Sequence, residues 1–461
     1  MNVLTPPAPS RPPRRPGLRG GLAASWFAEP AAHVRQLWAA EGATLVTGFV
    51  QLAVLTRILG IEGLGTASLV VAVPTLAFSL LDPQSQSAVT RSLARQHARS
   101  DGSRAAAAIR LGYIADGLLA LGGTLLLALL SPLIAHHLLR GDVPAALVAV
   151  AVLGASSASS VLTSRAVLGS IDAFRTIRRV AVYVAVGRCA AVCAAAALWG
   201  IAGFVLAVAG TQVLEAVAYA VVATGAHRRA VGVGVRDVRT DVLGAERREL
   251  VRFMGYTNVT TFLGALYKDA DLVIVGVLAG PLDAGRLKIA RTVALGIGRA
   301  VGPLQAVAVT RLYRTAEDGG TAALRRQCRR YLLRVGLPVM LAGLLALPLV
   351  PGALTAVTGT ADSGALAATL WLTGAALVSL AFFWVVPSLV AANRPRTLLV
   401  LSGTTSILCF LGYLAVAGPF GATGVAVVRA LGAGLVANLV FLAILPRILP
   451  DPAASLEGAG V

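Results

Sequence analysis

Apolar residues dominate the chain in long stretches, which short polar clusters separate. The stretches are rich in alanine and leucine and do not alternate between polar and apolar positions, which favours helices over strands. Each is close to the length of about 20 residues that a helix needs to cross a bilayer. The pattern predicts an all-α polytopic membrane protein with about twelve transmembrane helices: 41–59, 64–87, 111–135, 144–168, 180–199, 201–224, 253–278, 287–310, 336–356, 364–390, 397–417 and 421–446.

The composition supports a chain surrounded by lipid. Of its 461 residues, 57% are hydrophobic and only 13% are charged, and the mean hydropathy is +0.78. A soluble globular domain carries about 25% charged residues. A soluble enzyme and a nucleic-acid binder are therefore excluded, although the net charge of +19 by itself would be compatible with nucleic acid.

The basic residues account for that charge by their positions. Thirty of the forty fall on the termini and on alternate loops, whereas the opposite loops hold only Arg140 and Arg286. Because basic loops stay on the cytoplasmic side, both termini are predicted to be cytoplasmic, in agreement with an even number of helices. The net charge therefore indicates topology and calls for no nucleic-acid partner.

An internal repeat divides the chain in two. Pro83 and Pro303 are each followed, after five residues, by Val-Thr-Arg, and Gly65 and Gly285 match at the same offset of 220 residues. Two copies of six helices have the same orientation, and transporters built from parallel repeats bind their substrate between the halves. The predicted organisation is a cytoplasmic tail over 1–40, with an interfacial helix or a linker at 22–40, an N-terminal lobe over 41–224, a cytoplasmic linker over 225–252, a C-terminal lobe over 253–446 and a cytoplasmic tail over 447–461.

Basic residues inside the predicted spans are candidate substrate ligands, because a charge at this depth usually faces a bundle interior or a cavity. Arg165 and Lys288 lie near span ends and are expected to reach the interface instead. An excess of arginine suits an anion, and the forked guanidinium suits phosphate in particular. The sequence therefore predicts that the substrate is an amphiphile with a phosphate or pyrophosphate head. Five arginines are predicted to bind this head: Arg188, Arg299, Arg429, Arg291 and Arg57. Arg291 and Arg299, eight residues apart, are expected to share a helix face.

Acidic residues in the spans are fewer, and two interpretations remain open for them. They either pair with the arginines or couple transport to a proton or cation gradient, since a carboxylate in a cavity can cycle between protonation states. The coupling candidates are Asp271, Asp269 and Glu215. Asp269 and Asp271 point to different faces of an unbroken helix, so both cannot serve one site on it. Asp116 lies in the inner third of its span.

Motifs of enzymes and of nucleotide or metal sites are missing from the sequence. Lys268 follows tyrosine and Lys288 follows leucine, so neither belongs to a phosphate-binding loop, which needs glycine before lysine. His-x-x-x-His, Cys-x-x-Cys and Gly-x-Ser-x-Gly do not occur. We therefore expect a chain that is not an enzyme, with no cofactor and no metal.

Two short motifs resemble polysaccharide flippases, the O-antigen and teichoic-acid exporters of the multidrug/oligosaccharidyl-lipid/polysaccharide (MOP) superfamily. Arg57-Ile58-Leu59-Gly60 followed by Gly65 resembles the end of that family's first helix. Asp271, with Val275-Gly276 and then Gly285, is similar to its seventh and eighth spans. The resemblance covers residues 40–450, but Leu64 and Arg286-Leu287 stand where the family often has tyrosine.

This resemblance implies a V-shaped, two-lobed bundle of the MATE type in the bacterial cytoplasmic membrane. It also implies movement of an undecaprenyl-pyrophosphate-linked glycan, or a similar lipid carrier, between leaflets, driven by an ion gradient or the membrane potential. The implied partners are that lipid-linked glycan, membrane lipids, and the polymerase and glycosyltransferases of the same cell-surface polysaccharide or lipopolysaccharide pathway.

Two alternatives stay open. A relative of the same fold could export drugs, as a MATE-type cation antiporter, or flip the peptidoglycan precursor lipid. A drug exporter should have an acidic cavity for cations, whereas arginines dominate here. A membrane enzyme or a non-transporting scaffold would need neither the repeat nor the charges inside the spans.

Overall fold

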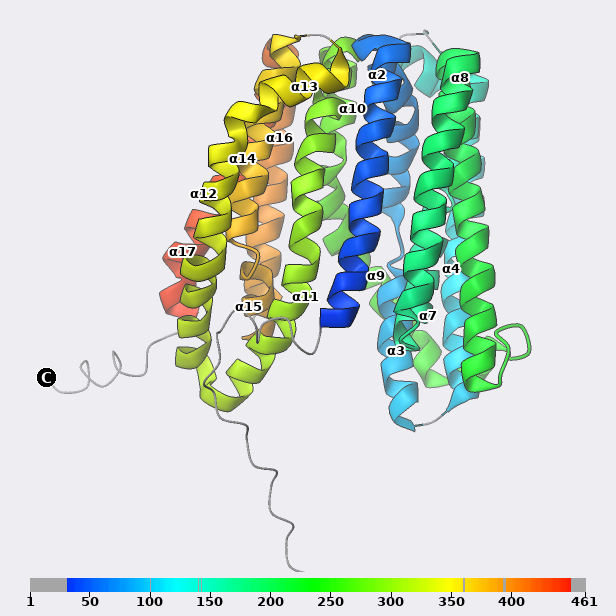
Figure 1. Cartoon of the computed structure of the whole chain (residues 1–461). Helices are drawn as coiled ribbons and strands as arrows, with labels where there is room; N and C mark the ends of the chain where they lie inside the picture. The colour runs from blue at the N-terminus through cyan, green and yellow to red at the C-terminus, as the bar shows by residue number, and fades with distance from the viewer. Residues whose placement is uncertain are drawn as a thin grey trace, which may run out of the picture.

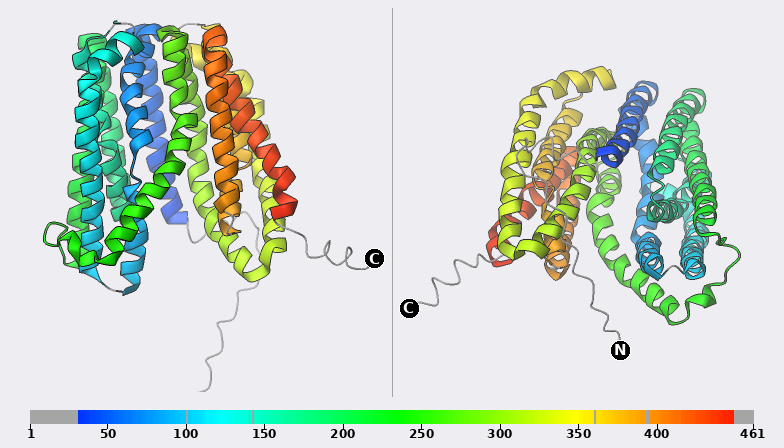
Figure 2. Two further views of the ribbon diagram at one scale, coloured as in Figure 1. Left: turned by 180° about the vertical axis from the view of Figure 1, so that it is seen from behind. Right: turned by 60° about the horizontal axis from the view of Figure 1, so that its bottom comes forward.

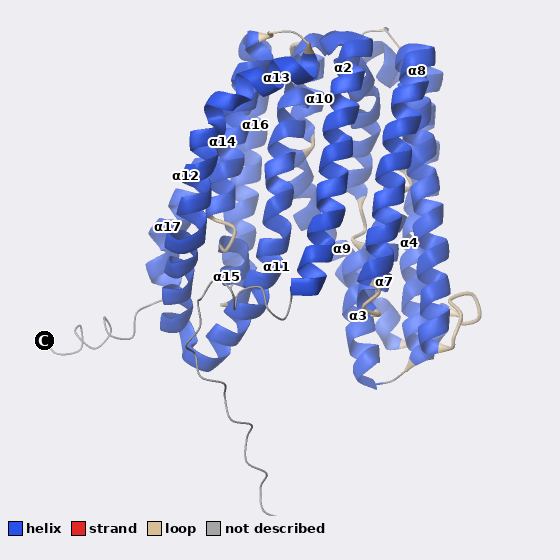
Figure 3. Ribbon diagram, viewed as in Figure 1, coloured by secondary structure: helices blue, strands red, loops and turns tan. Residues whose placement is uncertain are grey.

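The computed structural model describes residues 31–448 except 100, 140, 142, 360, 393 and 394. Of the predicted tails over 1–40 and 447–461, residues 1–30 and 449–461 lie outside the described residues. Nearly all of the described chain is helical, and no strand occurs within it (Figure 3). The predicted all-α class is confirmed.

Helices of the N-terminal half form one bundle, drawn from blue to green in Figure 1. Its first helix begins at Ala31 rather than at the predicted residue 41. The helices are α2 (Ala31–Leu81), α3 (Ser85–Arg99), α4 (Gly102–Leu129), α5 (Ser131–Leu133), η1 (Ile134–Leu138), α6 (Ala145–Ala155), α7 (Ala158–Ser170) and α8 (Phe174–Val231).

Helices of the C-terminal half form the second bundle, drawn from green to red. Of the predicted linker, only 232–244 lies outside the α-helices, and it contains a 3-10 turn, η2 (Thr240–Leu243). The helices are α9 (Ala245–Lys268), α10 (Ala270–Leu278), α11 (Pro281–Tyr331), η3 (Leu332–Gly336), α12 (Leu337–Ala346), η4 (Leu347–Leu349), α13 (Val350–Thr358), α14 (Ser363–Ala381), α15 (Val385–Ala391), α16 (Pro395–Arg429), η5 (Ala430–Val436) and α17 (Ala437–Ile448).

Glycines turn three of the four longest helices, α2, α8 and α16, back on themselves. The backbone leaves the helical region at Gly60, Gly200 and Gly421, where positive φ angles of 71°, 57° and 54° favour glycine. Seven stretches of the described chain are long and apolar enough to cross a membrane, and three of them contain such a turn. Together with α9–α10 and the first part of α11, they account for the twelve predicted spans. We call the end of the bundle that holds these three glycines the glycine-turn end.

The outer surface of the bundle is apolar. Leu118, Leu121, Leu125 and Leu129 of α4 are all exposed, and exposed leucine and valine recur on most of the other long helices. A contiguous apolar surface of this extent is incompatible with water, and it matches the hydrocarbon of a bilayer. The opposite end to the glycine turns carries Arg91, Arg95, Arg104, Arg239 and Arg247, and we call it the arginine-rich end.

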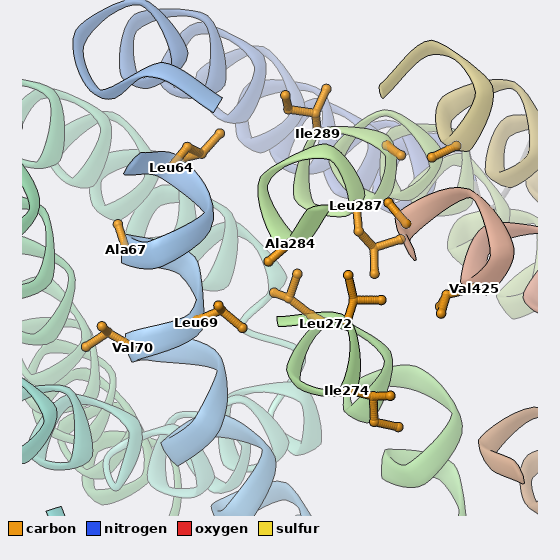
Figure 4. Close-up of a cluster of buried hydrophobic side chains, with 14 of the residues drawn as sticks. Leu64, Ala67, Leu69, Val70, Leu272, Ile274, Ala284, Leu287, Ile289 and Val425 are labelled. Atoms are coloured by element: carbon orange, nitrogen blue, oxygen red, sulfur yellow. The ribbon is translucent and has the colours of Figure 1, made fainter. Parts of the chain in front are cut away.

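The two halves meet along α2, α10 and α11. A Cβ at Gly65 would overlap the carbonyl oxygen of Pro281, and a Cβ at Gly285 would overlap that of Ile61. The two repeat-related glycines therefore lie in one reciprocal contact near the glycine-turn end. Below it, buried side chains of the two halves interdigitate (Figure 4): Leu64, Leu69, Leu272, Ala284 and Leu287. From this seam the halves diverge toward the arginine-rich end (Figure 1).

Helix α9 bridges the halves. Its first turns pack with Leu250 and Met254 against Ala107 and Leu111 of α4. Its later turns lie against α16 of the C-terminal half, and Figure 2 shows the diagonal course between the two bundles.

Several predicted spans are interrupted in the structure, among them those over 144–168, at 156–157, and over 364–390, at 382–384. The span predicted over 64–87 is interrupted at 82–84, between α2 and α3, where Gln84 has a φ of 51°. The span predicted over 253–278 is interrupted at Asp269, between α9 and α10. Pro303 of the repeat lies within the unbroken α11, although its side chain is outside what the structure describes.

Candidate functional site

A cavity of about 730 Å³ lies between the halves, bounded by α2, α7, α8 and α11. Its wall extends along α2 from Glu41 to Leu64, and the glycine contact of the seam lies just beyond Leu64. Apolar side chains line one part of it, among them Phe49, Leu52, Leu55 and Phe204. Its charged lining residues carry a formal surplus of two positive charges: Arg165, Arg188, Lys288 and Arg299 against Glu41 and Glu215.

The turn at Gly200 brings two of these residues together. Arg188 and Glu215 lie at similar distances before and after the turn, so the two legs of α8 place them side by side. Arg188 Nη2 donates to Glu215 Oε2 at 2.6 Å, and Arg165 Nη2 lies 3.5 Å from Glu215 Oε1. The Arg165 guanidinium also stacks 4.9 Å from the centre of the Tyr219 ring. We call Arg165, Arg188 and Glu215 the cavity triad.

The other two basic residues come from α11. Lys288 and Arg299 are eleven residues apart, close to three turns of 3.6 residues, and Thr292 and Leu295 between them also line the cavity. Arg299 Nε lies 3.8 Å from Glu41 Oε2. The expectation that Lys288 and Arg165 reach the interface is wrong, because both side chains line the cavity. The spacing of 288, 292, 295 and 299 along one helix face could have revealed this.

Some donors in this cavity have no partner within the described chain. Arg188 Nε is buried and makes no hydrogen bond there, and Lys288 has no carboxylate within 4 Å among the described residues. A buried donor that lacks a partner is unfavourable by about 1–3 kcal/mol, and more when it is charged. An anion bound in the cavity would satisfy both groups.

A second charge cluster lies in the C-terminal half, and none of its residues lines the cavity. Asp271 of α10 has no exposed side-chain surface, and it accepts hydrogen bonds from Arg291 Nη1 at 2.7 Å and Arg429 Nη1 at 2.5 Å. Arg291 also donates to the carbonyl of Lys268 at 2.9 Å, and the Arg429 guanidinium lies 5.1 Å from the centre of the Tyr267 ring. We call Asp271, Arg291 and Arg429 the buried triad.

Arg291 and Arg299, which were predicted to share a helix face, lie in different clusters in the structure. Arg291 points to Asp271 and Arg299 to the cavity, so the predicted shared face of these two arginines is wrong. Their spacing of eight residues leaves them about 80° apart around the helix. Because the chain breaks at Asp269, this residue also reaches Arg291, at 3.7 Å, alongside Asp271. The prediction that Asp269 and Asp271 cannot serve one site is therefore wrong, because it assumed an unbroken helix.

Arg57 belongs to neither cluster. Its Nη2 donates to the carbonyl oxygen of Ala356 in α13 at 2.8 Å, near the glycine-turn end. The five predicted head-group arginines thus lie in three places: Arg188 and Arg299 in the cavity, Arg291 and Arg429 in the buried triad, and Arg57 against α13.

Asp362 and Arg286 form a further ion pair outside the spans. Arg286 donates to both carboxylate oxygens of Asp362, at 2.9 and 2.8 Å, and Ala365 N donates to Oδ1 as a helix cap. Burial alone would raise the pKa of Asp362, but these hydrogen bonds outweigh burial and lower it. The pair therefore anchors the start of α14.

The cavity can hold an amphiphile with an anionic head. Arginine forks bind phosphate oxygens in pairs, a lysine adds a point charge, and the apolar wall accepts hydrocarbon. Among the described residues, no group of three or more histidine, cysteine or acidic side chains is placed to hold a metal ion.

Fold and site together define a multi-pass membrane protein of two helical lobes with a cationic cavity between them. Residues 36–309, more than half of the chain, match the model of the family described as polysaccharide biosynthesis protein. The chain belongs to this family, and the resemblance found in the sequence is confirmed at that level.

Solved structures with the same fold belong to the MOP superfamily. One is the lipid II flippase MurJ in an inward closed conformation, with a TM-score of 0.69, 12% identity, and coverage of 88% of this chain and 86% of that chain. Another is an inward-facing multidrug resistance MATE family transporter, with a TM-score of 0.67, 12% identity, and coverage of 90% and 96%. A MOP superfamily transporter from Pyrococcus furiosus has a TM-score of 0.57, 13% identity, and coverage of 92% and 97%. No curated protein matches the chain.

Proposed function

We propose that the protein flips a polyprenyl-pyrophosphate-linked oligosaccharide across the bacterial cytoplasmic membrane for cell-surface polysaccharide synthesis. The observation that carries this proposal is the cavity, in which four basic side chains face two acidic ones beside an apolar wall. Membership of the polysaccharide biosynthesis family supports a glycan as the cargo. The surplus of positive charge speaks against the alternative of a cation-exporting drug antiporter.

Transport proceeds by alternating access between the two lobes. The seam at Gly65 and Gly285 closes the glycine-turn end, and the halves diverge at the arginine-rich end. With the arginine-rich end and both termini in the cytoplasm, the cavity faces the leaflet in which the lipid-linked glycan is made. The pyrophosphate displaces Glu215 from Arg188 and Arg165, while Lys288 and Arg299 approach it from the opposite lobe. The head group thereby links the lobes.

The acidic residues of the two triads have different roles in this proposal. Glu215 is the acid placed to exchange with the substrate, whereas Asp271 and Asp269 hold arginines of the buried triad. An ion gradient or the membrane potential drives the cycle. The polymerase and glycosyltransferases of the same pathway are the expected partners, since they make and consume the lipid-linked glycan.

Reconstituted vesicles test the proposal. Purified protein in liposomes receives a fluorescent polyprenyl-pyrophosphate disaccharide, and a membrane-impermeant quencher reports its movement between leaflets. Loss of one charge-assisted hydrogen bond of about 1.5–3 kcal/mol should slow flipping roughly 10–100-fold in Arg188→Ala and Lys288→Ala. Arg239→Ala, at an arginine that is 85% exposed, is the matched control and should flip at the wild-type rate. Unchanged flipping in both cavity variants would overturn the proposal, as would equal flipping of a lipid that lacks phosphate.

A further inference from the structure

A second buried acid lies between α3, α4 and α7 and belongs to neither triad. Asp116 of α4 is 2% exposed. Its Oδ1 is 2.5 Å from Ser85 Oγ, its Oδ2 is 2.7 Å from Thr163 Oγ1, and the two hydroxyl oxygens are 2.7 Å apart. All three contacts have hydrogen-bond length, and together they form a closed ring of three side chains.

The ring has three contacts, but its two hydroxyl groups supply protons for only two hydrogen bonds. Ser85 and Thr163 supply one proton each, and an ionised carboxylate supplies none. If both hydroxyls donate to the carboxylate, no proton remains for the contact of 2.7 Å between the two hydroxyl oxygens. If Asp116 carries the third proton, each side chain donates once and accepts once, and every contact is a hydrogen bond. The geometry therefore fits the carboxylic acid rather than the carboxylate.

The surroundings supply no positive charge to an ionised Asp116. No arginine, lysine or histidine of the described chain lies within 4 Å of its carboxyl group. The titratable groups that face it are Asp82, at the end of α2, and Tyr113, one turn away on α4, whose hydroxyl is 2.8 Å from Ser164 Oγ. Neither is a cation, so a buried carboxylate here would be unpaired, which is strongly unfavourable.

Close packing holds the ring together. A Cβ at Gly112, one turn before Asp116, would lie 2.6 Å from Val89 Cγ2 and 3.3 Å from Thr163 Cγ2. The absence of a side chain at Gly112 therefore allows α3 and α7 to approach α4. Separation of α3 from α4 would open the ring and admit water to Asp116.

Helix α3 connects the ring to the other half of the molecule. Ser85 is its first residue, directly after the break at 82–84. Asn258 of α9 donates to the carbonyl oxygen of Asp82 at 2.7 Å. Farther along α3, Ser92 and Gln96 donate to the carboxylate of Glu246 of α9, both at 2.9 Å. Because α9 bridges the two lobes, a shift of α3 changes the contact between them.

We propose that Asp116, with Ser85 and Thr163, is a proton-binding site whose release of the proton moves α3 and with it the bridging helix α9. In this step the O–H bond of Asp116 breaks, its electron pair stays on the carboxylate, and the proton passes to water that enters when α3 leaves α4. The coupling of this site to lipid transport rests on the proposed function, but its protonation does not. Asp271, Asp269 and Glu215, which the sequence singled out, each have an arginine within 4 Å, and Asp116 has none among the described residues.

Infrared spectroscopy without substrate tests the site itself. The probe is the carboxylic-acid C=O band of the purified protein in nanodiscs, followed as the pH is raised. Asp116→Asn is the informative variant, because an amide donates and accepts like the acid and keeps the ring closed. Asp237→Asn, at an exposed aspartate of the loop before α9, is the matched control.

We expect the wild type and Asp237→Asn to keep a carboxylic-acid band after the exposed carboxyl groups have ionised, and Asp116→Asn to lose it. The wild type should also melt at a lower temperature in alkaline than in acidic buffer, and that difference should shrink in Asp116→Asn. Ser85→Ala should shift the band rather than remove it, which covers the case in which Asp116→Asn does not fold. A band unchanged in Asp116→Asn would overturn the proposal, and so would stabilisation by sodium ions with no carboxylic-acid band.

Transport assays in liposomes distinguish the proton-binding site from the proposed function. In liposomes, Asp116→Asn should bind the lipid pyrophosphate as the wild type does and lose the acceleration by a pH gradient. If the wild type flips no lipid-linked glycan while the band behaves as expected, the proposed function fails and the proton site stands. If flipping occurs and responds equally to a pH gradient in Asp116→Asn, the site is not coupled to transport.

Discussion

The cavity triad and the buried triad have the same composition but different surroundings. Each combines one carboxylate with two arginines, and in each an arginine stacks on a tyrosine ring. Exposure distinguishes them: the side chains of Glu215, Arg188 and Arg165 are 15%, 32% and 43% exposed, whereas Asp271 is fully buried and its arginines are 17% exposed. Burial and the adjoining cavity, rather than the residue types, therefore distinguish the proposed binding group from the buried triad.

The largest expected effect comes from removal of the carboxylate of the buried triad. Asp271→Ala leaves Arg429 without a carboxylate partner among the described residues and Arg291 with only the longer contact to Asp269, which should lower the free energy of unfolding by about 3–5 kcal/mol. Glu215→Ala is the comparison variant and should lose far less, because its arginines are reached by water. Thermal unfolding of both variants in detergent measures the difference, and equal losses would break the distinction between the triads.

Substitutions at Gly65 and Gly285 test the contact that the two halves make through equivalent glycines of the repeat. Gly65→Ala and Gly285→Ala each place a Cβ against a backbone carbonyl of the other half, so both should destabilise the protein by about 1–3 kcal/mol. Gly298→Ala on α11 has open space around its Cβ and, in a helix interior, should be neutral or stabilising by up to about 1 kcal/mol. A loss at only one of the two seam glycines would show that the repeat-related contact is not reciprocal.

The loss of stability expected at the pair of Asp362 and Arg286 is intermediate, because this pair is partly exposed and lies outside the spans. Asp362→Asn should cost about 1–2 kcal/mol, since it weakens a charge-assisted bond and a helix cap. The folded-state pKa of Asp362 is lowered, so its contribution is present above the unfolded pKa and is lost as the pH falls through the folded pKa. A wild-type melting temperature that falls in acid no more than that of Asp362→Asn would contradict this account.

The smallest effect concerns binding at the cavity triad. Glu215→Gln removes the carboxylate that competes with the substrate for Arg188, a pair of a kind worth about 0.2–1 kcal/mol when it is open to water. The affinity for a short polyprenyl pyrophosphate should therefore rise up to about fivefold. Calorimetric titration of the variant against the wild type measures this, and weaker binding would show that Glu215 orients the site rather than occupying it.

The pattern of apolar residues was sufficient to predict the twelve spans, and the matches at an offset of 220 residues were sufficient to predict the repeat. The site was less accessible to sequence reasoning, because depth in the membrane does not say whether a charge faces a cavity or a partner. By depth alone, Arg429 was grouped with Arg188. In the structure, however, Arg429 pairs with the buried carboxylate of Asp271, which is 158 residues away in sequence. The ring of Ser85, Asp116 and Thr163 joins three helices far apart in sequence, and no spacing along one helix could have revealed it.

Binding of a short polyprenyl pyrophosphate to Arg188→Ala and Arg291→Ala, measured beside their melting temperatures, tests the central claim most directly. We expect Arg188→Ala to keep its melting temperature within a few degrees and to bind roughly tenfold or more weakly, as expected for a lost charge-assisted bond. Arg291→Ala should melt much earlier and, while folded, bind like the wild type. The opposite pattern, with binding lost in a stable Arg291→Ala and retained in Arg188→Ala, would contradict the assignment of the cavity as the head-group site.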